Sequence, residues 1–93
     1  MSSPDIEIYL HDTPAKAVLE WLQQRFPHSA SAKPLGKHQW QLNAQYNTQA
    51  LPILIIENAS IGFTSLWIDS DASPWPDDQA CAREAYQFFQ KEI

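Results

Sequence analysis

Two apolar runs joined by a short polar segment constrain the fold more than any other feature of this chain. The runs LPILIIE (residues 51–57) and IGFTSLWID (residues 61–69) are rich in β-branched and aromatic residues, which favour strands. Asn58, Ala59 and Ser60 separate the runs, and so short a segment is typical of the turn between two antiparallel neighbours. The pattern therefore predicts a hairpin at the centre of a sheet.

A strand and a helix are predicted before this hairpin. Residues 5–11 alternate isoleucine and leucine with polar or aromatic residues, which is the period of a strand with one buried face. Thr13 and Pro14 are then predicted as the N-cap and the first residue of a helix. Apolar residues recur at three- and four-residue spacing as far as Phe26, where a following proline ends the helix.

The middle of the chain is predicted as a hairpin or an irregular pair of edge strands. Two short extended pieces lie on either side of Leu35 and Gly36, and Pro34 restricts the first piece to an edge position because proline cannot donate to a neighbouring strand. The polar segment 43–49 is predicted as a loop.

A second helix is predicted over residues 76–93, since this segment contains Ala, Gln, Glu, Arg and Lys in helix-forming proportions. Cys81 falls on one stripe with Ala85 and Phe88. We therefore interpret this cysteine as a small core residue rather than a nucleophile.

These elements predict one compact α+β domain spanning residues 1–93. The expected order is β-α-β-β-β(-β)-α, with a mainly antiparallel sheet of about four or five strands. Each helix has a single apolar stripe, so both helices are expected on one face of the sheet in a two-layer sandwich. This order is similar to that of many small bacterial α+β domains, including ferredoxin-like ones, and such a likeness implies nothing about a functional site.

The charge pattern argues against nucleic acids and membranes as partners. The formal net charge is -5, and no two basic residues are adjacent, so the clusters that bind phosphate or anionic lipid are missing from the sequence. The longest apolar run, ILII, is far too short to cross a bilayer. A single cysteine and an acidic N-terminal stretch unlike a signal peptide predict a cytoplasmic protein.

No motif predicts a catalytic residue, a cofactor or a metal site. The three histidines lack metal-ligand spacing, and two glycines are too few for a phosphate-binding loop. Asp69, Asp71 and Ser73 resemble the start of a calcium loop, but Pro74 stands where such a loop needs glycine. An enzyme is therefore the less favoured class.

Two regions are candidate binding sites. In the first, Asp69 and Asp71 precede Trp75, which stands between two prolines. Trp75 either anchors a partner, as tryptophan often does at interfaces, or folds back as a lid over the sheet edge or helix end. The second region is an aromatic sheet face that is expected to present Tyr9, His38, Trp40 and Trp67.

These regions favour a small interaction module that binds a protein partner, and the excess of acidic residues is consistent with a basic partner. An acidic inhibitor of a basic enzyme belongs to this class. The alternative is a small-molecule-binding domain or minor enzyme, with a pocket between the sheet and the helices or at a dimer seam. The sequence leaves both a monomer and a homodimer open.

Overall fold

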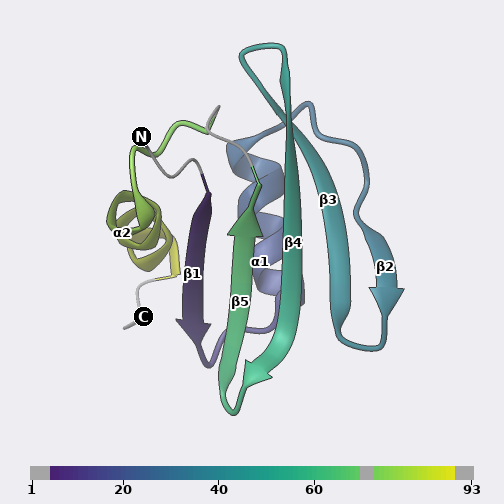
Figure 1. The fold of residues 1–93 in the computed structure, drawn as a ribbon, viewed down its shortest axis with the longest axis vertical. Helices are drawn as coiled ribbons and strands as arrows, with labels where there is room; N and C mark the ends of the chain where they lie inside the picture. The colour runs from purple at the N-terminus through teal and green to yellow at the C-terminus, as the bar shows by residue number, and fades with distance from the viewer. Residues whose placement is uncertain (1–4, 70–72, 90–93) are drawn as a thin grey trace.

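The computed structural model describes residues 5–69 and 73–89. Its elements are β1 (Ile6–His11), α1 (Ala15–Arg25), β2 (Lys33–Gly36), β3 (Gln39–Tyr46), β4 (Gln49–Ser60), β5 (Phe63–Ile68) and α2 (Asp78–Phe89). The strands form one antiparallel sheet in the order β1-β5-β4-β3-β2, so β4 is the central strand (Figure 1). The predicted α+β class and the predicted order of elements are confirmed.

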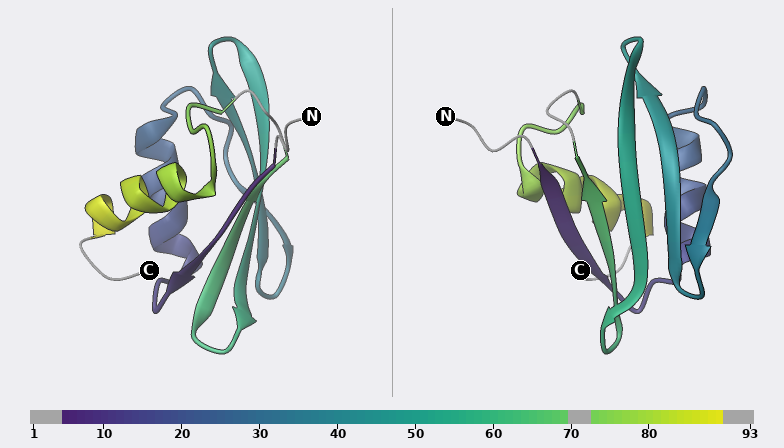
Figure 2. Two further views of the ribbon diagram at one scale, coloured as in Figure 1. Left: turned by 60° about the vertical axis from the view of Figure 1, so that its left-hand side comes forward. Right: turned by 45° about the vertical axis from the view of Figure 1, so that its right-hand side comes forward.

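Both helices cover the same face of the sheet (Figure 2). α1 packs against β3 and β4, whereas α2 packs against β1. We call this side the covered face and the opposite side, on which no described element packs, the uncovered face. No described helix has the length and apolar character that a membrane span requires.

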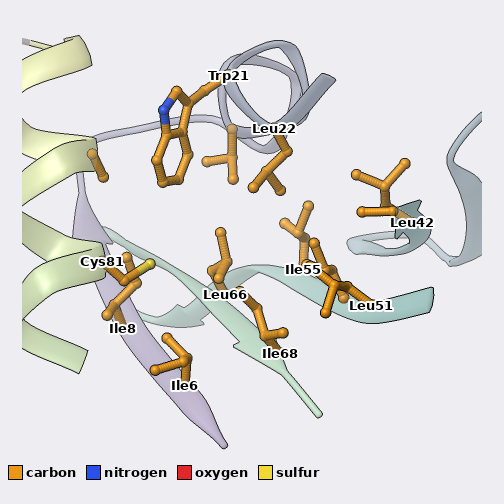
Figure 3. Close-up of a cluster of buried hydrophobic side chains, with 14 of the residues drawn as sticks. Ile6, Ile8, Trp21, Leu22, Leu42, Leu51, Ile55, Leu66, Ile68 and Cys81 are labelled. Atoms are coloured by element: carbon orange, nitrogen blue, oxygen red, sulfur yellow. The ribbon is translucent and has the colours of Figure 1, made fainter. Parts of the chain in front are cut away.

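The hydrophobic core lies between the covered face and the helices (Figure 3). Leu51, Ile53 and Ile55 of the central strand are fully buried there. Leu22 from α1 and Cys81 from α2 pack into the same cluster. Over residues 51–56 of β4, every second side chain therefore lies in the core.

The start of α1 is fixed by a residue far away in the sequence. Pro14, predicted as the first helical residue, is instead the N-cap, and its side chain makes no capping hydrogen bond. Glu57 of β4 instead accepts a hydrogen bond from the Ala15 backbone N–H at 2.9 Å across 42 positions of sequence. Thr13, predicted as the N-cap, donates its hydroxyl to the His11 carbonyl. A carboxylate at this helix end also interacts favourably with the helix dipole.

The segment 43–49, predicted as a loop, is instead the end of one strand, a tight turn and the start of the next. β3 and β4 pair as far as Tyr46 and Gln49. Asn47 and Thr48 have φ values of 52° and 65°, as a two-residue turn of the primed type requires. The prediction was wrong because threonine rarely adopts this conformation, so the turn signal is weak.

The predicted β4–β5 hairpin is present, but its turn lies later in the chain. β4 continues past Asn58, whose φ of 60° accompanies a shift in strand register. The chain reverses at Ile61 and Gly62, and the Gly62 carbonyl accepts a hydrogen bond from the Asp12 backbone N–H at 2.8 Å. This bond ties the turn to the end of β1.

β2 is the edge strand that Pro34 predicts. It pairs with β3, its residues are exposed, and a register shift lies between Pro34 and Gly36. The predicted hairpin exists, although the chain turns at residues 37–38 instead of at Leu35 and Gly36.

Candidate functional site

Trp75 lies in the core. Its side chain is 6% exposed, and its ring centroid is 5.7 Å from that of Trp21 and 5.8 Å from that of Phe26. The indole N–H donates a hydrogen bond to Glu84 Oε1 at 2.9 Å. Trp75 therefore has the position of a lid, and a ring with so little exposed surface offers little to a partner.

Glu84 connects Trp75 to both helices. Its second carboxylate oxygen accepts a hydrogen bond from Arg25 Nε at 2.8 Å, which joins α2 to α1. The Arg25 guanidinium also lies 5.7 Å from the centroid of the Trp75 ring. These contacts hold the segment before α2 against the helices, which is a structural role.

The described acidic residues around Trp75, Asp69 and Asp77, do not form one exposed site with it. Asp69 is exposed, and its backbone N–H donates to the Pro52 carbonyl at 3.1 Å. Asp77 accepts a hydrogen bond from the Ala80 N–H at 2.9 Å, which is the helix-capping role expected of an acidic residue before α2. Asp71 lies outside the described residues.

The structure separates His38 from Trp40. Trp40 pairs directly with the buried Ile55, and it packs, partly buried, against the core. Its predicted position on the uncovered face was therefore wrong, because residues directly opposite each other share one face. His38 is exposed in the turn before β3, with Nδ1 3.7 Å from Glu57 Oε1.

The uncovered face is apolar along the central strands. Pro52, Leu54 and Ile56 alternate with the buried residues of β4 and are half-buried on the opposite side. Phe63 and Trp67 of β5 share that side with them. Antiparallel sheets usually carry polar side chains on a face without helices, so a near-continuous apolar strand is typical of burial on both faces.

Two aromatic side chains extend this face toward β1. Trp67 is half-buried, and its indole N–H donates to Asp5 Oδ2 at 3.3 Å. Tyr9 is 45% exposed, and its hydroxyl lies 3.5 Å from Glu7 Oε2. The predictions for Tyr9 and Trp67 thus agree with the structure, whereas sequence reasoning missed Leu54 among the residues of this face.

Two depressions interrupt the uncovered face. One, of about 250 Å³, lies among Leu35, Leu54 and Trp67. The other is wider and open, with a volume of about 820 Å³, and lies beside Tyr9 at the β4–β5 turn. Ile61 at the tip of that turn is 97% exposed.

Cys81 is confirmed as a core residue. Its side chain is fully buried, and burial, together with the carboxylates of Glu84 and Asp78, raises the pKa of the thiol to about 12. Such a thiol is protonated at neutral pH and is a poor nucleophile. Across residues 5–69 and 73–89, no three His, Cys, Asp or Glu side chains are grouped so that they could hold a metal ion.

The fold and the uncovered face define the class of protein as a small α+β sandwich whose central strand is apolar on both sides. No protein-family model, curated protein or solved structure matches the chain. Evidence about function therefore comes from the surface of the chain itself.

Proposed function

We propose that this protein is an interaction module that binds a protein partner through the uncovered face of its sheet. The observation that carries the proposal is the run LPILII in β4, which is apolar on both faces although the helices cover one. Burial of apolar surface contributes about 25 cal/mol per Å². A partner on the uncovered face would gain this free energy, and contiguous apolar patches commonly mark interaction sites.

The aromatic residues of the face support a protein partner. Trp67 and Tyr9 belong to the residue types that contribute most to binding energy at interfaces. The hydrogen bond from Trp67 to Asp5 restrains the indole ring before binding, which lowers the entropy lost in a complex.

The acidic residues beside these rings argue against some partners. Asp5, Glu7 and Asp69 are exposed on this side of the molecule. Carboxylates repel phosphate groups, so nucleic acids and anionic membranes are disfavoured, whereas cationic groups of a protein are favoured here. We place the module in the cytoplasm, where a protein with a single buried cysteine needs no disulfide.

The small-molecule alternative has one observation in its favour, the open depression beside Tyr9 and Ile61. Small-molecule sites usually enclose about 70–90% of the ligand surface. An open depression encloses much less, so we prefer a protein partner. Saturable thermal stabilisation by a metabolite would favour the alternative instead.

Affinity capture from native cells tests the proposal when it compares the wild-type bait with Leu54→Asp. Gln23→Asp is the matched control, because Gln23 is exposed on α1 and gains the same charge away from the face. We expect wild type and the control to retain the same partner and Leu54→Asp to lose it while keeping its circular dichroism spectrum. Equal retention by a folded Leu54→Asp bait would rule out the uncovered face as the docking surface.

A further inference from the structure

We infer that the occupant of the uncovered face is a second copy of this chain, related to the first by a two-fold axis along β4. The inference rests on the proposed function and names the partner of the same face. A two-fold interface must be self-complementary, so that each residue meets its counterpart across the axis. Two rows of residues across the uncovered face satisfy this requirement, one in charge and the other in side-chain size.

One row of cross-strand neighbours runs across the uncovered face from edge to edge. In order from β1 to β2, the row consists of Glu7, Trp67, Leu54, Gln41 and Lys33. A carboxylate therefore stands at one end, an ammonium group at the other and leucine on the central strand. A two-fold axis along β4 would lay Leu54 on its own copy and each Glu7 over a Lys33.

The charges at the two ends are available for such pairing. Glu7 and Lys33 are exposed, and neither forms an ion pair with another described residue. The two-fold operation brings these opposite charges together twice, once at each edge. Although exposed ion pairs contribute little free energy, they select one orientation of two surfaces over others.

A second row shows complementary side-chain sizes. It runs from Tyr9 through Ser65, Ile56 and Gln39 to Gly36. The same axis would place Ile56 on its own copy and Tyr9 over Gly36. The space at Gly36 is open, since a Cβ there would meet no atom within 4 Å. The largest side chain of the row would thus lie over the smallest.

The first row also offers a recess for Trp67. The two-fold axis places the Trp67 ring over Gln41 of the second copy. Gln41 lines the depression of about 250 Å³ together with Leu35 and Leu54. An indole ring in this recess would be buried on both sides, which is the environment of aromatic residues that dominate binding energy.

The packing of two sheets permits this arrangement. Facing sheets usually cross at about 30°, which a tilt of the two-fold axis by about 15° from β4 produces. The edge strands lie about 10 Å from β4, because neighbouring strands are about 4.8 Å apart. A 30° crossing therefore displaces the edges by about 5 Å, which long Glu and Lys side chains can span. The result is a four-layer α/β/β/α dimer with both pairs of helices outside.

Sedimentation of the purified full chain tests the inference. We expect wild type and Gln23→Asp to form dimers and Leu54→Asp to be a folded monomer. A wild type that stays monomeric at high micromolar concentration would overturn the inference, and so would a dimer that Leu54→Asp leaves intact. A monomeric wild type whose capture of another protein depends on Leu54 would refute the inference and support the proposed function, so the two failures are distinguishable.

Charge reversal tests the orientation of the dimer without changing the apolar centre. Glu7→Lys and Lys33→Glu each place like charges together at both edges, so each variant alone should self-associate at least about tenfold more weakly. A mixture of the two variants restores opposite charges at both edges and should form mixed dimers with near wild-type affinity. The double variant should also dimerise. Absence of any preference for mixed dimers would overturn the proposed two-fold arrangement.

Discussion

The two faces of β4 differ less in their side chains than in what lies against them. Ile53 and Ile55 are fully buried beneath the helices, whereas Leu54 and Ile56 are only half-buried on the opposite side. The helices therefore cover one apolar side of β4 and leave the other apolar side uncovered within the described part of the chain. A strand suited to burial on both faces indicates an interface when only one face is covered within the chain.

Two tryptophans show the same contrast. Each indole N–H donates to a carboxylate, from Trp75 to Glu84 at 2.9 Å and from Trp67 to Asp5 at 3.3 Å. Trp75 is buried against Trp21 of α1 and against Phe26, whereas Trp67 is half-buried on the uncovered face. The first ring stabilises the fold, and in our proposal the second ring contributes to the interface.

The largest expected effect is the difference in unfolding free energy between variants that lack one or the other of these two rings. Trp75→Ala is expected to lower the free energy of unfolding by about 3–5 kcal/mol, because it leaves a cavity and an unpaired Glu84 oxygen. Trp67→Ala should cost about 1 kcal/mol or less in a dilute sample, where the face is not in contact with a partner. Urea unfolding at low protein concentration measures both values. Equal losses would contradict the assignment of the two rings to different roles.

A smaller effect on the free energy of unfolding is expected from the burial of the Cys81 thiol in the core. The folded pKa of this thiol is raised from 9.0 to about 12, so the folded state keeps the proton while the unfolded state loses it. Stability from this group is complete below pH 9 and is lost as the pH rises toward 12. We expect a loss on the order of 1–2 kcal/mol between pH 8 and pH 10.

The matched control for this pH effect is Cys81→Ala, which lacks the titrating group. Its free energy of unfolding should start lower because of the cavity, and should fall less steeply over the same range. If the free energy of unfolding fell equally steeply with pH in both proteins, the pKa of the thiol would not be raised in the folded state.

The smallest effect concerns the attachment of α1 to the covered face. Glu57→Gln removes the charge beside the helix N-terminus, where Glu57 accepts the Ala15 N–H, and should cost about 1 kcal/mol. Glu20→Gln serves as a control, since Glu20 is exposed on the same helix. Thermal melts of both variants give the comparison, and a larger loss for Glu20→Gln would argue against the cap.

The elements of the fold were predictable where their signals are local. The period-2 alternation of residues 5–11 and the apolar stripes of both helices depend on near neighbours alone. The β3–β4 hairpin was not recognised because Asn47 and Thr48 lack the glycine that usually marks such a turn. The cap of α1 was also missed, because Glu57 reaches it through the folded sheet.

The candidate site was less predictable because it depends on strand register. Tyr9 follows clear alternation, whereas Trp67 stands between two apolar residues. Trp40 could be assigned to a face only after its pairing with Ile55 was known. Leu54 lies in a run of consecutive apolar residues, so the sequence does not show whether the odd- or the even-numbered side chains point to the core. The burial of Trp75 depends on the path of the chain before α2, which no sequence period encodes.

The central claim is that two copies of the chain associate through the uncovered face and not through the covered face. Its most direct measurement is the indole N–H resonance of each tryptophan in nitrogen-labelled protein during dilution from millimolar to micromolar concentration. Assignment uses Trp67→Phe and Trp75→Phe. We predict that the Trp67 resonance moves with concentration while the Trp75 resonance stays in place. A Trp67 resonance that is constant over the whole series would contradict the claim.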